Sequence, residues 1–503
     1  MRSHRDSVFA ILLVSAFLCI GLANTLTHEM WRDELQSWMI AKDSTSIENL
    51  FWNKRYEGHP SLWHICLYVL SRFTHQPITM QFFHLMVATA TVYIFTRFSP
   101  FTRLQKILFV FGFFPLYEYG TISRHYAMSV LFIFCLCALL RNPNRNYIIM
   151  SCILFLIAQT IIFAVIIAIA FGATFFFGYI ADRDFRKSLS ARKTEILIGI
   201  SIYILGIVSS VLQCIPPADV GAYSGWKTNI DICYLLQSIS AVCRSYLLVN
   251  RNILPCAAFN AVVSIFLLSF WLLVFYRKPV VLLLYSLGTT GLLAFGYLKA
   301  TIGIRHHGYL FILLIVCLWL SDYNRDREPK HRLISNFSTF CNKYRVSFIT
   351  AILLIHCLSG IAASGRDWLQ PYSAGKQTAK FINDKHISGM LMAGDWDYVA
   401  SVVAGYLDRK IYYPRTDRFG SFILWDKRWG DEKLKNRSSS EILQKIEELA
   451  TQKKQDVLLI MNYKLNISEY PIVEIEAFNK SIKTDEVCYL YIYKHDDPIK
   501  QIR

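Results

Sequence analysis

Acidic residues gather in a polar stretch that follows the first apolar segment of the sequence. The stretch from His28 to His64 contains Asp33, Glu34 and Glu57, together with several tryptophans of the kind that settle at membrane interfaces. A carboxylate beside a membrane can act as a general base toward an acceptor hydroxyl or amine, and it can also hold a divalent cation. An acidic pair in a loop is more often only solvated, so both interpretations stay open at this point.

A second polar group, Ser123-Arg124-His125-Tyr126, lies at the junction of two apolar runs. Ionisable residues at such a depth are costly and often mark functional sites. The guanidinium of Arg124 could bind a phosphate through two parallel hydrogen bonds. It could equally extend to the lipid headgroups as an ordinary interfacial arginine.

A third group, which contains Lys299, Arg305, His306 and His307, precedes the apolar run 308–321. The expected topology places these residues on the outer face, against the usual bias of positive charge toward the cytoplasm. A lipid-linked phosphate or pyrophosphate is a natural partner for them. The paired histidines could indicate a metal site instead, but adjacent side chains rarely bind one ion together.

The elements that must position these groups are membrane-spanning helices. The 503 residues are 54% hydrophobic and 18% charged, which is more apolar than a soluble protein of this length. One crossing needs about 20 apolar residues. The sequence predicts twelve apolar helices, at 8–26, 60–76, 79–97, 104–118, 124–140, 146–159, 161–181, 194–214, 253–276, 279–297, 308–321 and 346–363. The stretch 230–249 is amphipathic and is expected in the interface plane.

The formal charge of +17 is concentrated in short loops between the apolar runs, which excludes nucleic acid as a partner. The basic loops 182–193 and 322–345 and the N-terminus are expected in the cytoplasm, and residues 364–503 outside. Because that topology needs an odd number of crossings, we expect eleven or thirteen. Either 146–181 is one long bent helix, or a short run between 60 and 97 enters the membrane without crossing it.

Residues 364–503 contain charged residues of both signs throughout, unlike the apolar runs that precede them. Runs typical of strands alternate there with runs typical of helices, which predicts a small α/β domain. It contains neither a glycine-rich phosphate loop nor a nucleophile elbow. We therefore expect a transmembrane domain at 1–363, with its acidic motif in the external loop 27–60, and an accessory domain at 364–503 that covers the membrane site or contacts the acceptor.

Three motifs taken together resemble the GT-C superfamily of membrane glycosyltransferases that use polyprenyl-phosphate sugars. They are the Asp33-Glu34 pair, the segment His59-Pro60-Ser61-Leu62 and the segment Ser123-Arg124-His125-Tyr126-Ala127. The nearest branch contains protein O-mannosyltransferases, the aminoarabinose transferase of lipid A and lipopolysaccharide galacturonosyltransferases. Ser61 stands where a second proline is common, and His125 replaces an apolar residue. The resemblance covers roughly residues 1–320.

The resemblance implies a GT-C-like fold and an inverting glycosyltransferase that moves a sugar from a polyprenyl-phosphate donor to an envelope glycan, lipid or protein. Asp33 would be the general base, and Glu34 would assist it, through a divalent cation if the enzyme uses one. No other cofactor is implied. Arg124 and Tyr126 would line the donor site, in a bacterial inner membrane with the site facing the periplasm.

Charge and topology assign the remaining candidates. Lys299, Arg305 and His306 would hold the lipid phosphate, and Glu57 and His59 would organise the loop or the acceptor. The alternatives are a transporter or flippase of a lipid-linked saccharide, and a polysaccharide polymerase or ligase. A transporter predicts internal repeats and charges at the bilayer midplane, whereas a polymerase predicts its key arginines in a large central loop.

Overall fold

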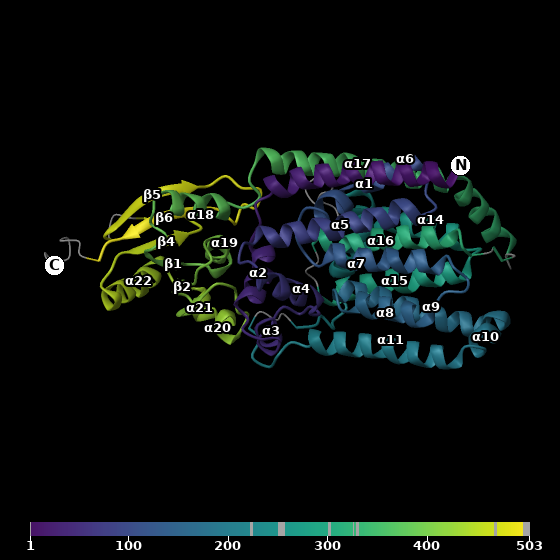
Figure 1. The fold of residues 1–503 in the computed structure, drawn as a ribbon, viewed down its shortest axis with the longest axis horizontal. Helices are drawn as coiled ribbons and strands as arrows, with labels where there is room; N and C mark the ends of the chain where they lie inside the picture. Colours follow the sequence, from purple (N-terminus) through teal and green to yellow (C-terminus); the bar gives the residue numbers. More distant parts are fainter. Residues whose placement is uncertain are drawn as a thin grey trace. The chain divides into compact units, whose positions relative to one another are not determined.

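Helices make up most of the chain, and the longest of them are apolar (Figure 1). The computed structural model describes residues 2–221, 225–249, 257–299, 303–324, 326–327, 331–466 and 470–495. Within these residues, eight helices are long and apolar enough to cross a membrane, so the chain is an integral membrane protein. They are α1 (Arg2–Thr27), α5 (Ile78–Phe98), α9 (Ile162–Ala181), α11 (Lys193–Cys214), α14 (Ala257–Phe275), α15 (Pro279–Lys299), α16 (Ile304–Ser321) and α17 (Arg332–Leu369).

Several predicted apolar runs form shorter helices. Three of these are apolar, namely α4 (Leu62–Ser71), α7 (Tyr126–Leu140) and α8 (Tyr147–Ala158). The run 104–118 is divided into α6 (Arg103–Val110) and a π-helix, η1 (Phe113–Glu118). The polytopic helical class is thus confirmed, with eight full-length spans among the described residues where eleven to thirteen were expected. The idea of one bent helix at 146–181 is wrong, because α8 ends at Ala158 and α9 begins at Ile162.

The chain divides into two compact units that do not follow a single cut in the sequence. One unit contains residues 1–22, 84–215 and 224–364 and is called here the helical unit. The other contains residues 23–83, 216–223 and 365–503 and is called the motif unit, because it includes the acidic motif. The predicted loop 27–60 thus belongs to the same compact unit as the C-terminal residues. The predicted division into two domains at residue 363 stays a prediction.

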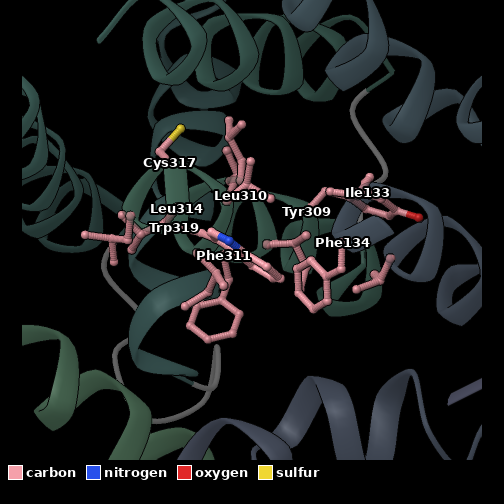
Figure 2. Packing of buried hydrophobic residues seen from close by; sticks show 14 of the residues in the cluster. Ile133, Phe134, Tyr309, Leu310, Phe311, Leu314, Cys317 and Trp319 are labelled. Carbon is pink, nitrogen blue, oxygen red and sulfur yellow. The ribbon is translucent and has the colours of Figure 1, made fainter. Parts of the chain in front are cut away.

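Helix α16 lies in the core of the helical unit. Its residues from His307 to Ser321 are all buried, as expected for a helix that is apolar on every side. Figure 2 shows Phe311 and Trp319 of this helix gathered with Phe134 of α7, whose ring lies 5.6 Å from that of Trp319. The first turn of α16, which carries Arg305 and His306, is therefore fixed by the packing of the whole helix.

The stretch 230–249 forms two short helices, α12 (Ile232–Ile239) and α13 (Ala241–Leu247). Five of the seven residues of α13 are buried, and α13 packs against α14 and α16. The Ser245 hydroxyl donates to the carbonyl of His307 at 2.7 Å, which joins α13 to the start of α16. The expected position of this stretch on the membrane surface is therefore wrong for α13, which is part of the helical unit's core.

The motif unit contains a six-stranded sheet with the order β3-β2-β1-β4-β6-β5. The strands are β1 (Leu391–Gly394), β2 (Ile411–Tyr413), β3 (Arg418–Gly420), β4 (Val457–Met461), β5 (Ile472–Phe478) and β6 (Cys488–Tyr493). Strand β1 runs parallel to β2 and β4, and the outer pairs are antiparallel. Helices α18 (Gly375–Asp384) and α19 (Asp397–Leu407) cover one face, and α22 (Ser439–Lys453) covers the other (Figure 1). The predicted small α/β domain is confirmed.

The acidic motif lies on a helix rather than in a loop. Helix α2 (Arg32–Asp43) buries eight of its twelve residues, and it packs against α4 and α19. A short helix, α3 (Ile47–Asn53), follows it. Gly58 then adopts a φ of +65°, a left-handed conformation that glycine takes without strain, and the chain turns there toward Pro60 and α4.

Candidate functional site

Asp33 lies in the first turn of α2 and is half-buried. The positive end of the helix dipole favours a carboxylate at this position. Its neighbour Arg32 forms ion pairs with Asp485 at 2.8 Å and Glu486 at 3.6 Å, both in the segment that precedes β6. The C-terminal domain therefore holds the start of the helix that presents Asp33.

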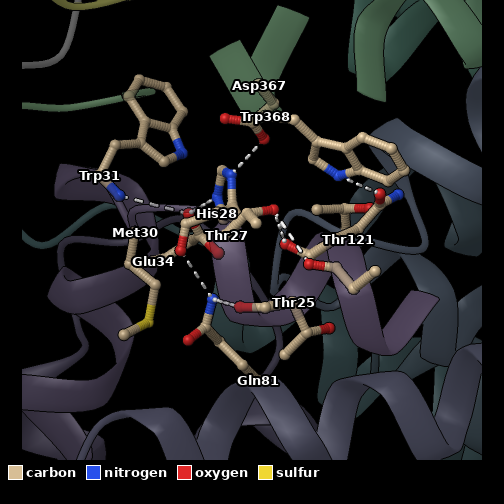
Figure 3. Close-up of polar contacts among 12 residues, drawn as sticks. Thr25, Thr27, His28, Met30, Trp31, Glu34, Gln81, Thr121, Asp367 and Trp368 are labelled. Carbon is tan, nitrogen blue, oxygen red and sulfur yellow. Dashed lines mark hydrogen bonds and ion pairs between the residues drawn. The ribbon is translucent and has the colours of Figure 1, made fainter. Parts of the chain in front are cut away.

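Glu34, the other half of the predicted pair, is fully buried. Its carboxylate lies 3.0 Å from Nε2 of His28, and it also accepts the backbone N–H of Trp31 at 3.3 Å. Nδ1 of His28 lies 2.6 Å from a carboxylate oxygen of Asp367, at the end of α17 (Figure 3). Glu34 is thus committed to a buried network with His28 and Asp367, and Asp33 is the more exposed carboxylate of the pair.

Charge explains why His28 is buried between two acids. Burial opposes a charged imidazole, but the carboxylates of Glu34 and Asp367 outweigh it and raise the pKa of His28 to about 10. The ring is therefore a cation at neutral pH. Sequence reasoning missed this network, since Asp367 lies 339 residues from His28 and no local pattern connects them.

Two further carboxyls of the motif unit take up protons near neutral pH. Burial raises the pKa of Glu29 to about 7, against the influence of Lys376. Burial also raises the pKa of Glu486 to about 8, against the influence of Ser373 and Arg32. A carboxyl that titrates near neutral pH is suited to general acid–base chemistry. Glu29 therefore joins Asp33 as a candidate for proton transfer, although sequence reasoning did not select it.

Glu57 and His59 have local contacts in the turn that leads to α4. Oε1 of Glu57 accepts the side-chain amide of Gln36 at 2.9 Å, and Gln36 also donates to the carbonyl of Ile423. The backbone carbonyl of His59 accepts Nζ of the buried Lys54 at 2.6 Å. These bonds fit the predicted role of organising the loop, which stays a prediction.

In the helical unit, Arg124 and Tyr126 lie where the chain enters α7, and both are buried. The ring of Tyr126 stacks on that of Tyr119, with centroids 5.3 Å apart and an angle of 10°. Tyr119 donates its hydroxyl to the carbonyl of Arg305 at 2.5 Å. The second and third polar groups of the sequence are therefore joined through Tyr119, and the ring of His306 lies 6.1 Å from that of Tyr126.

A cavity of about 350 Å³ opens beside His306. The ring of His306 stacks on Phe163 at 4.9 Å, and the cavity is lined further by Arg244 of α13, by His307 and by polar residues of α12. His307 is buried, and among the described residues its Nδ1 meets no hydrogen-bonding partner. Arg244 and His307 are therefore candidate ligand contacts. Arg244 was missed because its stretch was expected on the membrane surface.

Lys299 ends α15, and its ammonium lies 4.7 Å from the ring centre of Trp226, a cation–π contact. The residues between Lys299 and Gly303 lie outside the described part of the chain. Lys299 does not line the cavity beside His306. Its predicted contact with a lipid phosphate stays a prediction, as do those of Arg305 and His306.

The candidate residues thus fall into two sets. Asp33, Glu34, Glu57 and His59 belong to the motif unit, and the five donor-site candidates belong to the helical unit. Across the described ranges, no group of three or more histidine, cysteine, aspartate or glutamate side chains has an arrangement that would hold a metal ion. Glu34 is poorly placed to bind a cation, because its carboxylate pairs with His28 at 3.0 Å.

The fold defines a polytopic membrane protein with a small α/β domain on its C-terminal side. No protein-family profile matches the sequence, and no curated protein matches it. The chain is similar in structure to ArnT, the aminoarabinose transferase of Cupriavidus metallidurans, in a crystal structure bound to undecaprenyl phosphate. The TM-score is 0.53 and the identity 10%, over 96% of this chain and 97% of ArnT. The predicted GT-C resemblance is therefore confirmed for the fold.

Proposed function

We propose that this chain is an inverting glycosyltransferase that takes a sugar from a polyprenyl-phosphate donor. The acceptor is an envelope glycan, lipid or protein, and the reaction takes place on the periplasmic face of a bacterial inner membrane. The observation that carries the proposal is the likeness of fold to ArnT, which extends over nearly the full length of both chains. The ArnT structure holds undecaprenyl phosphate, a ligand of the class that this donor would require.

The cavity beside His306 supports a lipid-phosphate site in the helical unit. Its volume lies in the range of about 300–1,000 Å³ that is usual for small-molecule sites. Arg244 brings a guanidinium to the cavity wall, where it also donates to the carbonyl of Gln237 and the hydroxyl of Ser240, while Phe163 and Leu310 offer apolar surface to a hydrocarbon chain. His306 lies in the first turn of α16, where the helix dipole also favours an anion.

The proposed reaction is a single displacement. The acceptor hydroxyl or amine attacks the anomeric carbon and gives its proton to the Asp33 carboxylate, while the bond between that carbon and the phosphate oxygen breaks. The negative charge that the leaving lipid phosphate gains is stabilised by Arg244, which lines the cavity beside His306. Attack from the side opposite the phosphate inverts the configuration. Glu34 fixes α2 through His28 and leaves the chemistry to Asp33.

Transfer from membranes supplied with labelled lipid-linked sugar tests the assignment of Asp33. Asp33→Asn keeps the shape of the side chain and removes the base, so we expect transfer to fall by about 10²–10⁴-fold. Glu48→Gln is the matched control, because Glu48 is an exposed acid in the first turn of α3. A folded Asp33→Asn protein that transfers sugar at the wild-type rate would show that Asp33 is not the base.

A second pair of variants tests the cavity. We expect Arg244→Gln to raise the donor concentration needed for half-maximal transfer, with the fold retained. Lys187→Gln, which removes an exposed charge from the basic loop 182–193, is the control. If the donor requirement of Arg244→Gln equals that of the wild type, the lipid phosphate does not bind in this cavity. If the sugar never leaves the lipid in any preparation, the proposed transfer reaction is wrong.

A further inference from the structure

The sheet of the motif unit has a topological switch point at β1. From β1 the chain passes through α19 to β2 on one side, and the parallel strand on the other side, β4, is reached through α22. In open α/β sheets, ligands bind in the crevice at the carboxyl ends of the strands on either side of such a point. Asp395 to Asp397, which follow β1, lie at this crevice.

A narrow pocket lies at this place, and three of the polar side chains that line it each carry one oxygen atom that meets no hydrogen-bonding partner among the described residues. They are Asp397, Tyr413 and Thr416, which are 5%, 1% and 5% exposed. Among the described residues, Oδ2 of Asp397 and the hydroxyls of Tyr413 and Thr416 meet no hydrogen-bonding partner. Buried polar groups are costly unless they are paired, so three unpaired groups that line one pocket indicate a ligand with hydroxyl groups.

The walls of the pocket are held in place by their own contacts. Arg415 pairs with the fully buried carboxylate of Asp395 at 2.5 Å and lies 4.2 Å from the ring centre of Trp396. On the other wall, Nε1 of Trp429 donates to Oδ1 of Asp397 at 3.3 Å. Trp396 and Trp429 are both half-buried.

The size and charge of the pocket restrict the ligand. The cavity has a volume of about 10 Å³, which accommodates one group of the size of a water molecule. A phosphate is too large for it. A metal ion would find one carboxylate oxygen only, Oδ2 of Asp397, because Oδ1 accepts Nε1 of Trp429 and Asp395 is neutralised by Arg415. A single hydroxyl group, which both donates and accepts, matches the carboxylate and the two hydroxyls that line the pocket.

We propose that this pocket is a saccharide-binding site, in which one hydroxyl of a neutral hexose enters between Asp397, Tyr413 and Thr416. The ring of the sugar then packs against Trp396 and Trp429, since aromatic rings offer rigid apolar surface to its C–H groups. This site belongs to the C-terminal domain and goes beyond the proposed transfer reaction. Its occupant is a glycan that the enzyme holds, in addition to the donor in the membrane.

Saturation-transfer NMR on the full-length protein tests the proposal without any transfer reaction. The protein is placed in lipid nanodiscs, because detergents with sugar headgroups would compete. The probes are the methyl pyranosides of glucose, galactose and mannose. We expect saturation to reach the ring protons of at least one probe with the wild-type protein, and to fall at least tenfold with Asp397→Asn and with Tyr413→Phe.

Tyr412→Phe is the matched control, because Tyr412 is the neighbouring tyrosine on β2 and donates its hydroxyl to Asp417 instead. Thr416→Val is a second variant, should either of the others unfold. If no probe receives saturation from the wild-type protein, the pocket holds only a water molecule and the proposal is overturned. Equal saturation from the wild-type and pocket variants would mean that the sugar binds elsewhere. Neither result bears on the transfer reaction, which is measured with the lipid donor.

Discussion

The buried network of Glu34, His28 and Asp367 makes a quantitative prediction about stability. Glu34→Gln keeps the size of the side chain and removes one negative charge from a fully buried ion pair. Breaking a buried pair in this way usually costs about 3–5 kcal/mol. We therefore expect a loss of about 4 kcal/mol.

The same network predicts how stability changes with pH. Because the pKa of His28 is higher in the folded protein, its stabilising contribution is complete below pH 6.5 and is lost as the pH rises toward 10. The wild-type protein should therefore lose thermal stability across this window. Glu34→Gln should show a shallower decline, because its His28 has lost one of the two carboxylates that favour the charged ring.

Thermal unfolding of the purified protein at several pH values measures both effects. For a cooperative unit of about 200 residues, a loss of this size lowers Tm by roughly 10 °C. His75→Gln is the control, since His75 and Asp408 form an exposed pair at 3.0 Å, and such pairs contribute less than about 1 kcal/mol. A Glu34→Gln protein with the wild-type Tm and the wild-type pH profile would refute the assignment of His28 as a buried cation.

Three further predictions concern other parts of the chain. Burial raises the pKa of Glu486 from 4.5 to about 8 in the folded protein, so this group lowers the stability as the pH rises from 4.5 to 8. Glu486→Gln removes the titrating group and should flatten the decline in Tm over that range. A Cβ on Gly308 would lie 2.2 Å from the hydroxyl of Tyr119, so Gly308→Ala should lower the free energy of unfolding by about 1–3 kcal/mol. A Cβ on Gly365 would meet no atom within 4 Å, so Gly365→Ala is the control and should leave the thermal stability unchanged. Asp395→Asn leaves its buried arginine partner unpaired and should cost about 3–5 kcal/mol by the same measurement.

Hydropathy was sufficient to predict the helical membrane class, because each long helix must be apolar over most of its length in a bilayer. It failed where helices are short, since a run such as 104–118 can be divided between α6 and η1 without a change in composition. Alternation of strand and helix patterns likewise predicted the α/β domain. It did not reveal β3, a strand of three residues.

The polar composition of α2 concealed its burial. Its sequence contains arginine, aspartates, glutamate, glutamine and lysine, a composition that is typical of a solvated loop. Gln36 is nevertheless 6% exposed, because its amide exchanges hydrogen bonds with the backbone of Ile423, 387 residues away. Partners at such separations leave no trace in a local pattern. The sequence therefore indicated which residue types matter in this stretch but not which of them face the interior.

The geometry of a helix explains why the two adjacent acids of the motif take different roles. Consecutive residues point about 100° apart around a helix, so Asp33 and Glu34 cannot both face one ligand or one ion from the first turn of α2. The side chain of Glu34 points to the buried His28, whereas the side chain of Asp33 is half-exposed beside Arg32. Glu34 fixes α2 by pairing with the buried His28, which in turn pairs with the buried Asp367. We infer that this network serves to position Asp33. A substitution of Glu34 should therefore reduce activity through the placement of Asp33, while a substitution of Asp33 should remove activity and leave the network with His28 intact.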